Sequence, residues 1–241
     1  MKISVVIPAF NEEKLLPRCL AAVSSASQAF TALDWENEVI VCDNNSSDET
    51  ASLAEAAGAR VVFEPINQIA RARNRGASVA RGDWLIFVDA DSYPSRELFA
   101  KVAERLEDGQ TIGGGATVLL ENVSGSHWLL NHGWNWLSRG CGWMAGSFLF
   151  CERRAFEELG GFSPELFASE EIDFSERLKQ LARREKRRVG IIARPSLLTS
   201  GRRAELCRAR DYGRLLLTVL LSRGQSLKRK EDCSIWYDGK R

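Results

Sequence analysis

Two aspartates one residue apart, Asp89 and Asp91, are the side chains of this 241-residue chain best suited to chemistry. They follow the run 84–88, whose apolar residues on both faces predict a buried strand of a parallel sheet. Ligands bind beyond the carboxyl ends of such strands. Two carboxylates there offer the hard oxygen ligands that Mg²⁺ or Mn²⁺ prefers, with room for the oxygens of a nucleotide diphosphate. The structural alternative is that Asp91 or Ser92 caps a helix over 95–107.

Two further polar segments follow predicted strands, at 8–12 and 43–48. The carboxyl ends of parallel strands converge on one crevice, so we expect these segments to lie beside the two aspartates. Asp43 is able to accept the imide N–H of a uracil, because a buried carboxylate needs a donor within reach. Its structural alternative is an Asx turn, which we favour for 44–47.

The elements that must position these side chains alternate in the manner of βαβ units. The predicted strands are 3–8, 38–43, 60–64 and 84–88. The predicted helices are one from 12 to about 28 capped by Asn11, one capped by Ser47, and one over 69–80. Right-handed crossovers would place these strands in one parallel sheet, so the predicted fold class is α/β.

The second half of the chain is less regular. It predicts a strand that follows residues 113–115 and ends at Leu120, strands at 147–151 and 189–192, and helices at 153–159 and 170–186, the latter capped by Ser169. A segment rich in Gly and His holds Trp128, Trp134, Trp136 and Trp143. Such rings suit sugars or apolar acceptors, or a buried core.

The net charge of +1 conceals an asymmetry, since residues 1–182 carry 16 basic and 26 acidic side chains, whereas 183–241 carry 17 and 6. The C-terminal quarter therefore suits an anion such as a nucleotide phosphate, an anionic lipid surface or a nucleic acid. The apolar run 215–221 predicts a buried helix or one that lies against a membrane, and it is too short to span one. Six cysteines without Cys-x-x-Cys spacing indicate reduced thiols in a cytosolic protein.

Four segments in this order resemble the landmarks of family 2 inverting glycosyltransferases with the GT-A fold. They are 5–13, 41–50, 72–76 and 87–91. The resemblance continues through Gly146, 160–162 and 170–173, and it covers nearly the whole chain. It implies a Rossmann-like, mainly parallel sheet with helices on both faces. The implied organisation is a single domain over 1–241, with a nucleotide-binding half (1–91), an acceptor half (92–204) and a basic C-terminal helix and tail (205–241).

The resemblance also implies roles for single residues. The positions that match the family's nucleoside-binding residues are Pro8, Phe10, Glu12 and Asp43. Arg73 matches the arginine that reaches the base or the diphosphate. Asp89 would face the ribose or a metal-bound water, and Asp91 would ligate Mg²⁺ or Mn²⁺. Residues 199–203 resemble the Ser-x-Arg-Arg segment of small non-processive members, in which Arg202 and Arg203 would neutralise the diphosphate.

The general base would come from the family's acceptor-side Glu-Asp pair, which reads Glu170-Glu171 here. We predict Glu171, because it takes the second place and lies in the first turn of a helix, where the dipole favours an ionised carboxylate. Glu170 and Asp173 stay open as alternatives. Asp173 lies roughly 200° further around the helix and cannot enter the same pocket as Glu171.

The predicted function is metal-dependent transfer of a sugar from a nucleotide diphosphate, with UDP favoured, to an acceptor hydroxyl. The acceptor class stays open among lipid-linked, saccharide and small molecules, and no nucleic-acid partner is expected. We expect a cytoplasmic protein whose basic C-terminal region is a candidate for contact with the inner membrane face.

The sequence disfavours three alternative functions. A sugar-phosphate nucleotidyltransferase would need a Gly-rich, lysine-bearing loop after the first strand, which 8–13 lacks. A non-catalytic scaffold that binds nucleotide sugars is disfavoured by the acidic side chains. A dinucleotide-binding fold is disfavoured because no Gly-x-Gly-x-x-Gly follows the first strand.

Overall fold

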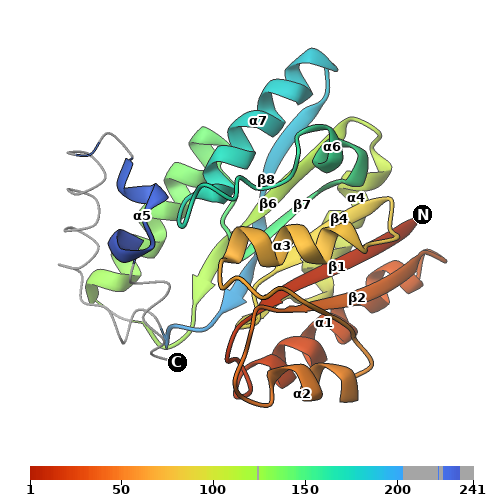
Figure 1. The fold of residues 1–241 in the computed structure, drawn as a ribbon. Helices are drawn as coiled ribbons and strands as arrows, with labels where there is room; N and C mark the ends of the chain where they lie inside the picture. The colour runs from red at the N-terminus through yellow and green to blue at the C-terminus, as the bar shows by residue number, and fades with distance from the viewer. Residues whose placement is uncertain (124, 203–221, 223–224, 234–241) are drawn as a thin grey trace.

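The computed structural model describes residues 1–123, 125–202, 222 and 225–233. Its strands form one mixed sheet of order β3-β2-β1-β4-β7-β6-β8-β5 (Figure 1). They are β1 (Lys2–Ala9), β2 (Glu36–Asp43), β3 (Arg60–Phe63), β4 (Trp84–Val88), β5 (Ser92–Tyr93), β6 (Thr111–Leu120), β7 (Phe148–Glu152) and β8 (Arg188–Thr199). Strands β1 to β4 are parallel, as predicted, and so are β6 and β8. Strand β7 is antiparallel to β4 and β6, and β5 to β8.

Helices cover both faces of this sheet, which confirms the predicted α/β architecture (Figure 1). They are α1 (Leu16–Thr31), α2 (Thr50–Ala56), α3 (Ile69–Ser78), α4 (Arg96–Glu107), α5 (Gly125–Cys141), α6 (Arg153–Glu158) and α7 (Glu170–Arg184), followed by the 3₁₀ turns η1 (Gln225–Lys228) and η2 (Lys230–Cys233). Within the described ranges, no helix combines the length and apolarity needed to cross a membrane.

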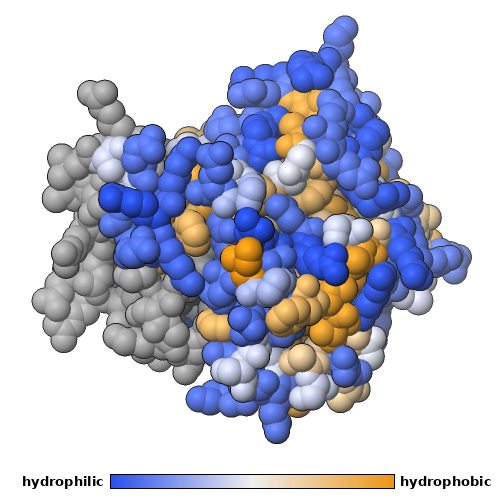
Figure 2. All heavy atoms as spheres, in the orientation of Figure 1, coloured by the Kyte–Doolittle hydropathy of each residue, from blue (hydrophilic) through white to orange (hydrophobic). Residues whose placement is uncertain are grey.

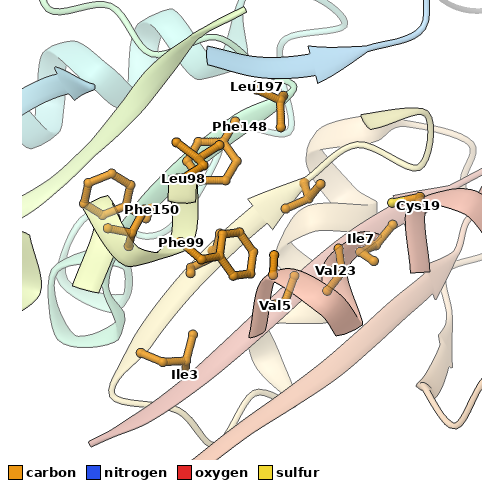
Figure 3. Close-up of a cluster of buried hydrophobic side chains, with 14 of the residues drawn as sticks. Ile3, Val5, Ile7, Cys19, Val23, Leu98, Phe99, Phe148, Phe150 and Leu197 are labelled. Atoms are coloured by element: carbon orange, nitrogen blue, oxygen red, sulfur yellow. The ribbon is translucent and has the colours of Figure 1, made fainter. Parts of the chain in front are cut away.

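The core lies on both sides of β1, because alternate side chains of a strand point to opposite faces. Ile3, Val5 and Ile7 pack in one cluster with α1 and α4 (Figure 3). Val6 packs in the second cluster, with Phe87 and the α7 side. This two-sided burial is why the strands read as unbroken apolar runs. By contrast, the surface turned to the viewer in Figure 2 is mostly hydrophilic, with hydrophobic patches between the polar side chains.

Helix α4 decides the structural alternative for the two aspartates. Ser95 is its N-cap, and the Ser95 hydroxyl accepts a hydrogen bond from the backbone N–H of Leu98. Ser92 instead lies in β5, within 2.9 Å of the Thr199 hydroxyl. The alternative that Asp91 or Ser92 caps this helix is therefore wrong.

Two other predicted caps are also wrong. Asn11 has a left-handed φ of 52°, and its side-chain oxygen accepts from the backbone N–H of Ser47. The two predicted caps thus bind each other, and α1 starts only at Leu16, beside Pro17, which suits a first turn. Helix α2 starts at Thr50, whose backbone N–H is taken by Asp48 rather than Ser47.

The second half differs from the prediction in three places. Strand β6 starts at Thr111, so residues 113–115 lie within the strand rather than before it. Ser169 precedes α7, but it has a φ of 64° and its side chain caps nothing. The Trp-rich segment, for which no element was predicted, forms α5. The described cysteines are free thiols, while Cys207 and the run 215–221 lie outside the described residues.

Candidate active site

A cavity of about 490 Å³ opens beyond the carboxyl end of β4. Asp89 and Asp91 line it, together with Glu170 and Glu171 from the start of α7. The end of the sheet at which a site was predicted therefore has a cavity, and its wall contains acidic side chains that follow β4 and begin α7.

Arg73 is almost completely buried in that wall, with 1% of its side chain exposed. Its Nη1 donates to Glu170 Oε1 at 2.6 Å, and its Nη2 donates to Asp89 Oδ1 at 2.9 Å and to the carbonyl of Gly146 at 2.7 Å. The guanidinium therefore ties the end of β4 to the start of α7. It was expected to reach the base or diphosphate of a nucleotide, but here it holds two carboxylates in place.

Gly146 lies where a side chain would disturb this arrangement. A Cβ at this position would lie 3.2 Å from Arg73 Nη2 and 3.4 Å from the carboxyl carbon of Glu171. The missing side chain leaves the carbonyl of Gly146 free to approach the guanidinium while Glu171 stays in the cavity wall.

The three candidates for the base have different surroundings. Glu170 is 3% exposed and paired with Arg73. Asp173 lies outside the cavity wall and accepts hydrogen bonds from Nε and Nη2 of Arg177 at 2.9 and 2.7 Å. Glu171 faces the cavity. Burial and the adjacent carboxylate of Glu170 raise the pKa of Glu171 to about 8, against the opposing attraction of Arg73.

The end of β8 brings Arg202 to the same region. The backbone carbonyl of Asp91 accepts hydrogen bonds from Ser200 N–H and the Thr199 hydroxyl, which joins the two chain segments. Arg202 Nη2 lies 2.8 and 3.1 Å from the carboxylate oxygens of Glu12 and 3.8 Å from Asp91 Oδ2. Arg203, its predicted partner, lies outside the described residues.

The predicted nucleoside-binding residues lie next to this cavity rather than in its lining. In the register of β1 and β2, Pro8 is opposite Cys42, and Ala9 is opposite Asp43. One carboxylate oxygen of Asp43 accepts from the backbone N–H of Ser46, a local contact that reaches one residue further than an Asx turn. Pro8, Phe10, Glu12 and Asp43 are absent from the cavity wall, and Arg202 connects the two groups through its contacts with Glu12 and Asp91.

A divalent cation fits the donor set at Asp91. Across the described part of the chain, no group of three or more His, Cys, Asp or Glu gathers in a metal-binding arrangement. Asp91 lines the cavity, and one oxygen of Asp89 is bound by Arg73. One or two carboxylates completed by water and diphosphate oxygens is the coordination that Mg²⁺ commonly takes.

Another part of the cavity wall comes from α5, a segment for which no helix or strand was predicted. His127, Leu130, Asn131 and Trp134 line it. Their spacing of i, i+3, i+4 and i+7 is that of one helix face, so this signal was present in the sequence.

Comparisons with known proteins agree on one family. Residues 4–166 match the model of glycosyl transferase family 2. Over 117 residues the chain is 37% identical to YfnE, an uncharacterized glycosyltransferase of Bacillus subtilis, which covers 46% of this chain and 29% of that protein.

Two solved structures show the same fold. S. aureus TarS in complex with UDP-GlcNAc has a TM-score of 0.64 at 21% identity, covering 83% of this chain and 58% of that chain. The mannosyltransferase PcManGT from Pyrobaculum calidifontis, in complex with GDP-Man and Mn²⁺, has a TM-score of 0.62 at 19% identity, covering 82% and 56%.

The matched segments span only 28–52% of the curated relatives' own lengths, as seen in YfnE and in proteins of Synechococcus elongatus and Mycobacterium bovis. The family model, however, covers more than half of this chain, and it includes β1 to β4 and both aspartates. The chain belongs to glycosyl transferase family 2.

Proposed function

We propose that this chain transfers a sugar from a nucleotide diphosphate, with UDP favoured, to an acceptor hydroxyl, with inversion at the anomeric carbon and with Mg²⁺ or Mn²⁺ as cofactor. The observation that carries the proposal is that Asp89, Asp91 and Glu171 line one cavity from two different elements. The donor class and the metal are further supported by the UDP-GlcNAc complex of TarS and by the GDP-Man and Mn²⁺ complex of PcManGT.

The donor side would be formed by the carboxyl ends of β1, β2 and β4. Asp91 would hold the metal with Asp89 beside it, and the bound metal would stabilise the charge of the departing diphosphate. Arg202 adds a guanidinium 3.8 Å from Asp91, close enough to neutralise a phosphate oxygen placed there. Asp43 and Glu12 would contact the nucleoside.

The acceptor side would be served by Glu171. Its carboxylate takes the proton of the acceptor hydroxyl, the acceptor oxygen attacks the anomeric carbon, and the bond from that carbon to the diphosphate oxygen breaks. The electron pair of the broken bond leaves with the nucleoside diphosphate. The raised pKa makes this carboxylate, in its ionised form, a stronger proton acceptor than an ordinary carboxylate.

A thermal-shift screen tests the donor side. UDP, GDP and dTDP are each added with Mn²⁺ or with EDTA, and UDP with Mn²⁺ is expected to give the largest rise in Tm. A ligand at about 100 times its Kd stabilises the folded state by about 2.7 kcal/mol, which is readily measured. If no nucleoside diphosphate raises Tm in the presence of Mn²⁺, the proposal is wrong. Turnover with a panel of UDP-sugars then tests the transfer itself.

A further inference from the structure

Helix α5 exposes a wide apolar face to solvent. Of the large apolar side chains that are exposed in the described residues, half lie on this one helix. They are Trp128, Leu129, Leu130, Trp136 and Leu137, with exposed fractions from 37% to 79%. At 100° per residue they cover about 200° of the helix circumference. We call these five residues the α5 apolar face.

We propose that the α5 apolar face docks onto an anionic lipid bilayer and brings a lipid-borne acceptor to the cavity. The docking stands by itself, whereas the identity of the acceptor rests on the proposed function.

The side of α5 that packs on the protein is held by polar contacts, so the α5 apolar face is not the side that packs on the sheet. Asn135 accepts from the backbone N–H of Val118 at 2.8 Å and donates to its carbonyl at 2.6 Å, so a polar side chain anchors the helix to β6. Ser138 is buried and donates to the carbonyl of Trp143. A surface helix normally turns its apolar stripe inward and its polar side outward. Around Asn135 and Ser138 this pattern is reversed, as expected of a helix whose outer side meets an apolar medium.

The chemistry of the face favours a bilayer interface. Tryptophan has an apolar ring and a polar N–H, and it concentrates at the boundary between lipid and water. The 17 residues of α5 include Arg139 but no Asp or Glu, so no acidic side chain of the helix would repel anionic headgroups. Residues 183–241 carry 17 basic and 6 acidic side chains, the charge that an anionic surface attracts.

The face is also continuous with the cavity. Leu130 is 50% exposed and lines the cavity wall, so it belongs to both. Phe167, on another part of that wall, donates its backbone N–H to the carbonyl of Leu227 in η1, which joins the basic C-terminal region to the cavity. An acceptor anchored in the bilayer beside α5 would thus reach Glu171 without leaving the membrane surface.

The test is co-sedimentation of the full chain with vesicles of phosphatidylcholine, either alone or mixed with phosphatidylglycerol. The double variant Leu129→Glu/Trp136→Glu places two charges on the face. The control is Leu33→Glu, the same change at a leucine beyond the end of α1 that is 40% exposed. We expect the parent and the control to sediment with the mixed vesicles. The double variant should bind these vesicles at least about tenfold more weakly.

Equal vesicle binding by the parent and the double variant would overturn the docking, as would binding that ignores phosphatidylglycerol. If the double variant instead turns a dimer into a monomer in size-exclusion chromatography and keeps its vesicle binding, the face is a contact between copies of the chain and the proposal is wrong. The thermal shift with UDP and Mn²⁺, measured on the same variants, reports the donor site separately. A loss of vesicle binding with an unchanged shift therefore separates the docking from the proposed function.

Discussion

Arg73 and Glu170 form a buried ion pair, with 2.6 Å between Nη1 and Oε1 and with 1% and 4% of the two side chains exposed. The same guanidinium also binds Asp89 at the end of β4. One cation thus holds two largely buried carboxylates that would otherwise repel each other in the cavity wall. Such a pair matters most when only one partner is removed, because the other charge is then left uncompensated.

Replacing Arg73 with Met should therefore lower the free energy of unfolding by about 3–5 kcal/mol, the usual cost of an orphaned buried charge. Urea unfolding monitored by circular dichroism measures it. The control is Arg154→Met, which removes a half-exposed arginine paired with Glu185 at 2.9 Å and should cost at most about 1 kcal/mol. Similar losses in the two variants would show that the buried network around Arg73 has no special weight.

Asp91→Asn should remove the Mn²⁺-dependent part of UDP binding, because an amide oxygen is a far weaker ligand than a carboxylate for a hard cation. Isothermal titration with UDP in Mn²⁺ and in EDTA separates the two contributions. The control is Asp173→Asn, which makes the same chemical change outside the cavity. If Asp91→Asn binds UDP with Mn²⁺ as tightly as the parent does, Asp91 is not the metal ligand.

Glu171→Gln keeps the shape of the side chain but cannot accept a proton. Sugar transfer should fall by about 10²-fold or more, while the affinity for the donor stays nearly unchanged. Asp173→Asn is measured beside it, and it should keep its rate because Asp173 is paired with Arg177 outside the cavity. A loss of rate in Asp173→Asn with none in Glu171→Gln would reverse the assignment.

The raised pKa of Glu171 also predicts how stability depends on pH. In the unfolded chain this carboxyl has a pKa of 4.5, and in the folded protein its pKa is raised to about 8. Between these values the folded state holds a proton that the unfolded state has lost, so the contribution of Glu171 to stability is complete below pH 4.5 and is lost as pH rises toward 8. The Tm of Glu171→Gln minus the Tm of the parent should therefore increase as pH rises over this range.

The control for this pH series is Glu176→Gln on the same helix. Hydrogen bonds from Lys179 and Trp143 lower the pKa of Glu176, so its contribution is lost only as pH falls below 4.5. The Tm difference between Glu176→Gln and the parent should stay flat from pH 5 to pH 8. A flat difference for Glu171→Gln as well would contradict the raised pKa.

Arg202→Ala should weaken the binding of UDP much more than that of uridine, because Arg202 lies beside Asp91, where the diphosphate is proposed to bind. Titration calorimetry with the two ligands gives the comparison. A charge-assisted hydrogen bond contributes about 1.5–3 kcal/mol, so a loss of about tenfold or more in UDP affinity is expected. Equal losses for UDP and uridine would place Arg202 at the nucleoside instead.

The parallel half of the sheet was predictable from the residue types and their order. The runs that became β1 and β4 are apolar on both faces because both sides of these strands are buried, so residue types alone predict them. Polar segments follow the predicted strands, so the sequence alone places Asp43, Asp89 and Asp91 at the carboxyl end of the sheet. The spacing of residues 127, 130, 131 and 134 also indicates one face of a helix, the face of α5 that lines the cavity.

The contacts between the side chains of the site, by contrast, depend on how distant segments pack. Arg73 and Glu170 are 97 positions apart in the sequence and meet at 2.6 Å, and no local pattern encodes such a pairing. The same holds for Arg202, whose contacts with Glu12 and Asp91 depend on how the end of β8 pairs with β5, the short strand that follows Asp91. The predictions of Asn11 and Ser47 as helix caps were wrong for a related reason, because these two residues from different loops hydrogen-bond to each other. Residue type fixes which side chains need partners, while the packing of distant segments decides which partners they find.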